Sequence, residues 1–181
     1  MTVRGETYDT KEGKLDLCGK EITDIGEIEG LEKLTDLQHL SLESNQIKEI
    51  KYLENLTNLK ILNLRENQIK EISGLENLKN LQELHLHVNL IKEIKGLENL
   101  VNLRILDLWY NQIVEIKGLD TLTNLQELHL GWNQITEIKG LEHLENLKHL
   151  FLGGNPLRDD EKHLVIENAQ DVVKYCQEKV S

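Results

Sequence analysis

The sequence has very little of several residue types that most folded proteins use freely. Its 181 residues include one Ala, one Phe, one Met and one Pro, and aromatic residues make up only 4% of the chain. Ala has the highest helix propensity and fits where helices approach closely, so a chain with a single Ala is not a helical bundle. The core must be built from other apolar side chains in a different architecture.

Other absences narrow the class of protein further. No apolar run approaches the roughly 18 residues that span a bilayer, and residues 1–6 hold no apolar stretch typical of a secretory signal. Cys18 and Cys176 lie at opposite ends of the chain, which does not indicate a disulfide framework. We therefore expect a cytoplasmic protein in a reducing compartment, with no membrane partner.

The charge balance bears on the partners. Asp and Glu exceed Lys and Arg by 32 to 21, which gives a net charge of −11. Nucleic-acid binding draws mainly on Lys and Arg that neutralise phosphates. We therefore expect no nucleic-acid partner.

The residues that are abundant follow a 22-residue repeat. Leu and Ile supply 51 of the 70 apolar residues, and each copy reads L-x-x-L-x-x-L-x-x-L-x-L-x-x-N-x-I-x-x-I-x-x. Full copies span residues 31–52, 53–74, 75–96, 97–118 and 119–140, with a truncated copy at 141–157, and the Asn position is held by Asn45, Asn67, Asn89, Asn111, Asn133 and Asn155. Five copies in one register indicate a repeat architecture.

The spacing within a copy predicts its local structure. The L-x-L pair has the period of a strand, and L-x-x-L-x-x-L has the threefold spacing of a tight helical turn. No copy can bury its Leu face alone, so the copies must stack into a solenoid of about seven coils whose strands form a parallel sheet. We expect the Asn amides to bind backbone groups at each corner as a structural ladder.

This pattern resembles the leucine-rich repeat family over residues 15–157, in the 22-residue class that includes the protein phosphatase 1 regulatory subunit and the bacterial internalins. The end of the chain, N-P-L followed by two predicted short helices, is more similar to repeat domains of Roco-type GTPases and related prokaryotic proteins. The resemblance implies an α/β horseshoe with a parallel sheet on its concave face, short helical or 3-10 turns on its convex face and a helical C-terminal cap.

Both ends depart from the repeat, as the capping of a solenoid requires. The predicted single domain, 1–181, comprises an N-terminal cap (1–14), a degenerate first repeat (15–30), the regular repeats (31–157) and a helical C-terminal cap (158–181). We expect a hairpin within residues 3–14. Asp159, Asp160 and Glu161 are expected at a helix N-terminus, where acidic side chains are favourable.

Strand alternation predicts which residues leave the core. Residues that flank or separate the two strand leucines point onto the concave face. Both Trp, the one Phe and five of the seven His fall at these positions. We expect Trp109, Tyr110, Trp132 and Phe151 to form one exposed aromatic patch typical of a protein-binding centre, with a shallow pocket over the glycines at 131, 153 and 154.

Polar residues surround this patch. We assign His85, His87, Asp107, Glu127, His129 and His149 to partner specificity. Two alternatives stay open for the His residues: a metal or small ligand bound by His85, Asp107 and His129, completed by His87 or His149, and pH-sensitive binding. A hydrolytic site lacks a nucleophile, because Ser41 lies two coils from His85.

The function predicted from these residues is a non-catalytic protein–protein interaction module, monomeric or weakly dimeric, with no cofactor, catalytic residue or resident metal. An alternative is a sensor or targeting component that acts in trans with a Roco-like or small GTPase. The chain has no G-x-x-x-x-G-K-[ST] loop and is not itself such a GTPase.

Overall fold

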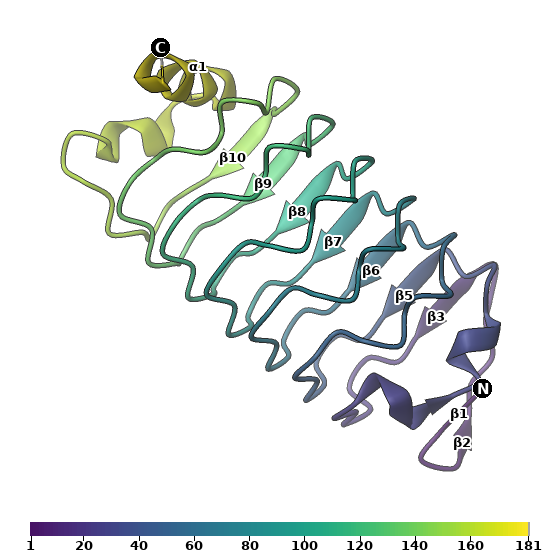
Figure 1. Cartoon of the computed structure of the whole chain (residues 1–181). Coiled ribbons are helices and arrows are strands. Elements are labelled where there is room, and N and C mark those ends of the chain that lie inside the picture. Colours follow the sequence, from purple (N-terminus) through teal and green to yellow (C-terminus); the bar gives the residue numbers. More distant parts are fainter. Residues whose placement is uncertain (181) are drawn as a thin grey trace.

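The computed structural model describes residues 1–180, which form a gently curved solenoid (Figure 1). Within these residues, one sheet of seven parallel strands has the order β10-β9-β8-β7-β6-β5-β3. The strands are β3 (Lys14–Asp16), β5 (His39–Ser41), β6 (Ile61–Asn63), β7 (Glu83–His85), β8 (Ile105–Asp107), β9 (Glu127–His129) and β10 (His149–Phe151). The predicted leucine-rich solenoid with its parallel sheet is confirmed.

The constant repeat length keeps the strands in register. Leu62 pairs with Leu84, and Leu84 pairs with Leu106, so each strand leucine faces its equivalent 22 residues away. Leu15 still pairs with Leu40 although 25 residues separate them. The longer first step holds the 3-10 helix η1 (Ile25–Glu27), the short strand β4 (Ile28–Glu29) and the 3-10 helix η2 (Leu31–Lys33).

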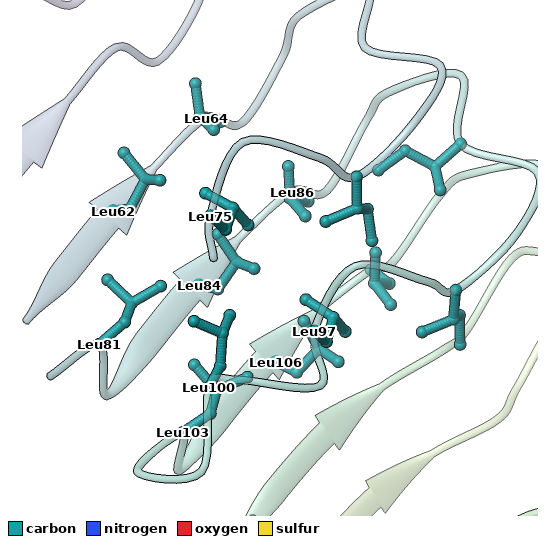
Figure 2. Packing of buried hydrophobic residues seen from close by; sticks show 14 of the residues in the cluster. Leu62, Leu64, Leu75, Leu81, Leu84, Leu86, Leu97, Leu100, Leu103 and Leu106 are labelled. Carbon is teal, nitrogen blue, oxygen red and sulfur yellow. The ribbon is translucent and has the colours of Figure 1, made fainter. Parts of the chain in front are cut away.

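The repeat leucines and isoleucines form one continuous core between the sheet and the convex side (Figure 2). On the convex side of the central coils, the three spaced leucines make successive single turns. Leu78 N–H donates to the Leu75 carbonyl at 2.9 Å, and Leu81 N–H donates to the Leu78 carbonyl at 2.9 Å. These i to i+3 bonds are the 3-10 geometry that the threefold spacing predicts.

The predicted Asn ladder is present at the corner after each strand from β5 to β10. The Asn111 amide donates to the Leu86 carbonyl at 3.0 Å and to the Leu108 carbonyl at 3.1 Å, and its oxygen accepts from Ile91 N–H at 3.0 Å. The first five of the six Asn side chains are buried. Each amide therefore joins its own coil to the preceding one.

A second amide ladder, which our sequence interpretation missed, runs along the exposed convex side. Asn102 donates to the Lys79 carbonyl of the preceding coil at 2.9 Å. The same bond is made by Asn58, Asn80, Asn124 and Asn146. The recurrence of Asn at this position in the five copies from residue 53 onward was the sequence signal for it, whereas the first full copy has Asp36 there.

The N-terminal end of the solenoid is covered by antiparallel pairing. Strands β1 (Thr2–Val3) and β2 (Glu6–Thr7) form a hairpin, and β1 also pairs with β4. Lys11 and Lys14 then exchange two backbone hydrogen bonds of 3.0 and 2.9 Å beside β3. The sheet is therefore closed by backbone pairing at its first strand.

The C-terminal end is covered by the 3-10 helix η3 (Lys162–Ile166) and the α-helix α1 (Ala169–Val180), which confirms the helical cap. Helix α1 buries Val172, Val173 and Cys176, and burial raises the pKa of the Cys176 thiol to about 11. Among residues 1–180, no helix is long and apolar enough to cross a membrane.

Glu161 lies at a helix N-terminus as predicted, since it is the N-cap residue of η3, but its side chain has another role. Its side chain makes no capping bond to η3. It is fully buried and instead accepts hydrogen bonds from Ile138 N–H (2.9 Å), the Tyr175 hydroxyl (2.8 Å) and Lys179 Nζ (2.7 Å). The carboxylate therefore connects the last regular coil to α1. Residue spacing does not reveal this contact, because the segments that it joins are distant in the sequence.

This carboxylate makes the stability of the cap depend on pH. Burial alone would raise the pKa of Glu161, but the hydrogen bonds from Lys179, Ile138 and Tyr175 outweigh burial and hold the pKa below its ordinary value. A lowered folded-state pKa contributes stability above the unfolded-state value, about 4.3, that is lost as pH falls through the folded-state pKa.

We therefore expect Glu161→Gln to lose about 2 kcal/mol of unfolding free energy at pH 7 and to show a weaker fall in stability below pH 4 than the unchanged chain. Urea unfolding at pH 7, 5 and 3 measures both. Glu167→Gln, at an exposed position of the same cap, is the control. If the two variants have the same pH profile, Glu161 has no special role.

Candidate functional site

The concave face carries exposed rings near its C-terminal end. Strand alternation places them there as predicted, and their exposed fractions are 37% for Trp109, 51% for Tyr110, 56% for Trp132 and 50% for Phe151. Large aromatic side chains this exposed, on a chain with so few of them, require an explanation other than core packing.

The rings divide into two groups. Trp109 and Tyr110 have ring centroids 5.4 Å apart, and Tyr110 stacks on Trp132 at 5.9 Å with 25° between the ring planes. We call Trp109, Tyr110 and Trp132 the aromatic cluster. Phe151 instead contacts the His129 ring at 4.5 Å. The ring contacts thus join three of the four predicted aromatic residues. The fourth, Phe151, contacts His129, which is one of the predicted polar residues.

The predicted pocket over the glycines is wrong at two of its three positions. A Cβ on Gly131 would lie 2.7 Å from Cδ1 of Trp109, and one on Gly154 would lie 2.9 Å from the Trp132 ring. Each indole therefore lies on the glycine backbone of the next coil and fills the space. Only a Cβ on Gly153 would meet nothing within 4 Å.

Two members of the aromatic cluster occupy an unfavourable backbone conformation. Tyr110 and Trp132 have φ of 56° and 54°, in the left-handed region. That region costs an L-residue roughly 1–2 kcal/mol and is the usual place of glycine, which the chain does use at the equivalent Gly154 (φ 78°). The equivalent residues of the earlier coils, Ser44, Glu66 and Val88, have φ of 53°, 52° and 54°, so this conformation belongs to the corner of the repeat and does not by itself mark the aromatic cluster.

One column of the repeat also loses its charge in the coils that carry the cluster. In the column that follows the first repeat Ile, the coils before Tyr110 carry Lys48, Lys70 and Lys92. The coils of Tyr110 and Trp132 carry Val114 and Thr136 there, and Val114 is 55% exposed. Our sequence interpretation missed this change, although comparing the Lys column between repeats would have revealed it.

The predicted polar residues converge on Asp107, but this carboxylate is only 5% exposed and so is not a free surface group. Its Oδ2 accepts from His87 Nδ1 at 3.1 Å and from Arg65 Nη2 at 3.3 Å, and Oδ1 accepts from Trp109 N–H at 3.2 Å. Asp107 therefore anchors the start of the aromatic cluster. Arg65 was absent from the predicted site.

The hydrogen bonds assign the proton on His85. Arg65 Nη2 lies 3.0 Å from His85 Nδ1, and a guanidinium only donates, so Nδ1 is the acceptor. The ring proton is then on Nε2, which faces Glu83 Oε2 at 3.2 Å. Glu83 and Arg65 thus hold the ring from both sides.

The same network bears on the metal alternative. Burial raises the pKa of Asp107, but the hydrogen bonds from His87 Nδ1 and the Trp109 N–H act against burial, and the pKa lies well below its usual range. The space between His85 and Asp107 is crossed by the Arg65 guanidinium, which would repel a cation. Among the described residues, the three potential ligands that do come within 4.8 Å of one another are Asp120, Glu142 and His143, away from the strands.

The remaining predicted residues lie toward the last strand. His149 is exposed, while Glu127 and His129 are half-buried, and His129 Nε2 lies 3.7 Å from Glu127 Oε2. His149 pairs with Glu127 across β9 and β10. The structure therefore gathers one set around Asp107 and another beside Phe151.

Comparison with known protein families accounts for the repeat. A family model described as leucine-rich repeats in two copies matches residues 35–77, 57–99, 79–121, 101–143 and 123–164. The chain belongs to the leucine-rich repeat family. None of the curated protein sequences is significantly similar to it.

Solved structures of leucine-rich repeat proteins share the fold. An internalin from Listeria monocytogenes is 31% identical with a TM-score of 0.74 over 87% of this chain, which spans 45% of that internalin. The ectodomain of the Arabidopsis thaliana receptor kinase GASSHO1/SCHENGEN3, in complex with CASPARIAN STRIP INTEGRITY FACTOR 2, is 30% identical with a TM-score of 0.61, over 70% of this chain and 17% of that one. TLR13 in its complex with ssRNA13 is 26% identical with a TM-score of 0.69, over 83% of this chain and 26% of that one.

Proposed function

We propose that this leucine-rich repeat protein is a non-catalytic binding module whose partner is a protein that docks on the concave face. The aromatic cluster provides the anchors. Phe151, His129 and His149 extend the contact toward the last strand, and Glu127 adds a charge. The buried Asp107 carboxylate, with the half-buried His85 and His87 beside it, holds the cluster in place.

The observation that carries the proposal is the position of Tyr110 and Trp132. Each is more than half exposed, at a corner position where the earlier coils carry Ser44, Glu66 and Val88 with the same backbone conformation. The repeat therefore folds without a ring at this position, so core packing does not account for these two rings. Rigid, amphipathic rings of this kind are the side chains that dominate protein interfaces.

The solved relatives support a macromolecular partner but differ in its chemistry, since one is a complex with a named protein factor and another a complex with RNA. The charges of this chain favour a protein. The Arg65 guanidinium on the concave face is already held by Asp107, and acidic residues outnumber basic ones by 32 to 21. A phosphate backbone would find few free cations here.

Removal of two anchors tests the proposal. We expect the double variant Trp109→Ala, Trp132→Ala to bind its protein partner at least 100-fold more weakly, because each interface hot spot contributes about 2 kcal/mol or more. Affinity capture with the unchanged chain followed by titration calorimetry on the recovered protein measures this loss.

Val101→Ala is the matched control, because Val101 is 46% exposed but lies on the convex side. It should bind as well as the unchanged chain. Unfolding curves establish that all three proteins are folded. A double variant that is folded and retains full affinity would contradict the proposed function.

A further inference from the structure

The two edges of the seven-stranded sheet differ. At the N-terminal edge, the Lys11–Lys14 pairing lies beside β3. At the other edge, β10 pairs with β9, and no residue among 1–180 pairs with its outer side. An open strand edge presents a row of hydrogen-bonding groups that accept another strand.

The repeat register identifies the groups on this outer side. Within the molecule, Leu130 N–H donates to the Phe151 carbonyl at 2.8 Å, and Trp132 N–H donates to the Gly153 carbonyl at 2.8 Å. The equivalent N–H groups one coil later are those of Leu152 and Gly154. Neither has a hydrogen-bond partner within the described part of the chain.

An acceptor completes the row. The Gln126 carbonyl receives Lys148 N–H at 2.8 Å and His149 N–H at 3.0 Å, and its equivalent one coil later is the Lys148 carbonyl. This carbonyl also lacks a partner among residues 1–180. The outer side of β10 thus offers an acceptor followed by two donors, in the spacing that each coil offers to the next.

Side chains at this edge are also exposed to solvent. The first strand leucine is 0–3% exposed in the other six strands, but Leu150 is only partly buried. Phe151 is 50% exposed, and His149 is exposed. The Trp132 ring lies on Gly154, so the aromatic cluster reaches this edge.

We propose that the partner inserts an extended segment that pairs in parallel with the outer side of β10. The inference rests on the proposed function, because it names the part of the partner that reaches the aromatic cluster. Added strands are held by main-chain hydrogen bonds and selected by alternate side chains. Three positions of the added segment would lie beside residues of β10, namely beside His149, Leu150 and Phe151.

The neighbours of these residues define the chemistry of the segment. On its inner side, His149 pairs with the acidic Glu127 and Phe151 pairs with His129. Opposite charges and ring contacts between adjacent strands are favourable. The segment therefore has an acidic residue beside His149, an apolar residue beside Leu150 and a ring beside Phe151.

The chain itself contains a probe with this pattern. The hexapeptide acetyl-Leu-Gln-Glu-Leu-His-Leu-amide is the sequence shared by residues 81–86 and 125–130. Aligned with residues 147–152, it places Glu beside His149, Leu beside Leu150 and His beside Phe151. The carbonyl of the peptide His lies where the Leu152 N–H needs an acceptor, so we expect this peptide to slow hydrogen exchange of the Leu152 amide by at least tenfold at saturation, as measured by NMR.

Single N-methyl groups on the peptide test the strand geometry. In parallel register, the peptide Glu and His N–H groups face β10, whereas the N–H of the Leu between them faces away. Methylation of either facing nitrogen should weaken binding at least tenfold, and methylation of the Leu nitrogen should change it less than twofold. Equal effects of all three methyl groups would overturn the proposal.

Charge reversal tests the residue beside His149. His149→Glu should weaken binding of the hexapeptide by up to about fivefold. It should strengthen, by a similar factor, binding of the same peptide with Lys in place of Glu. Equal responses to both peptides would remove the acidic preference. His163→Glu, in the C-terminal cap, is the control and should leave both affinities unchanged.

The outcomes separate this inference from the proposed function. If Trp109→Ala, Trp132→Ala retains full partner affinity, the proposed function fails. If that variant loses the partner while the peptide leaves the Leu152 amide unprotected, the proposed function stands and the edge pairing fails. A dimer in sedimentation, with the Leu152 amide already slow to exchange in the absence of peptide, would indicate that a second copy of the chain covers β10 and would also overturn the partner segment.

Discussion

Asn111→Ala is expected to lower the free energy of unfolding by about 4 kcal/mol. The substitution leaves the Leu86 and Leu108 carbonyls and the Ile91 N–H without the amide that now binds them. Each buried polar group left unpaired costs about 1–3 kcal/mol. Domains of this size are stable by only about 5–15 kcal/mol, so the loss is a large fraction of the total.

Urea unfolding followed by circular dichroism measures this loss. Asn102→Ala is the matched control, because Asn102 also joins two coils but makes one exposed bond, to the Lys79 carbonyl. We expect a loss of about 1 kcal/mol or less there. Since each coil contacts only its neighbours, Asn111→Ala should also broaden the transition as the two halves unfold separately. Equal losses in the two variants would contradict a special role for the buried ladder.

Gly96→Ala is expected to cost about 3 kcal/mol or more. A Cβ there would lie 2.5 Å from the Ile72 carbonyl oxygen of the preceding coil, and the residue has φ of 72°. The left-handed conformation alone costs a non-glycine residue roughly 1–2 kcal/mol. The backbone contact adds to this, because neither coil can move without disturbing the packed leucines on both sides.

Gly153→Ala is the control, because it would meet nothing within 4 Å, and its unfolding midpoint should hardly change. The chain contains its own comparison at Tyr52, which holds the position equivalent to Gly74 with φ of 64°. Its ring lies against Gly26, in the longer first coil. If Gly96→Ala lost little free energy of unfolding, the regular coils would tolerate a side chain at this position, as the coil with Tyr52 does.

The periodic features were predictable because every copy repeats the same contact. Leu84, Leu106 and Leu128 pair in one column, and a register defined in one coil holds for the next. The Asn ladder followed from the same regularity. The exposed Asn ladder is equally periodic, because Asn at this position recurs every 22 residues from Asn58 to Asn146.

The candidate site was predictable only in part, because its geometry depends on side-chain choices between coils. Alternation placed Trp109, Tyr110 and Trp132 on the concave face, but it did not show that Trp109 covers Gly131 or that Arg65 reaches Asp107. Long side chains can extend toward either neighbouring coil, and the spacing of the repeat is the same for both.

The sequence by itself determined the solenoid, its strand register and the residues that leave the core, because a strict 22-residue period allows one stacking that buries every leucine. The tertiary structure decided which of those residues are exposed. Asp107 is buried by its own partners, Glu161 is drawn into the cap, and β10 is left open at its outer side. These outcomes depend on contacts between different repeats or with the cap, where the sequence is not periodic and only packing in three dimensions decides between competing neighbours.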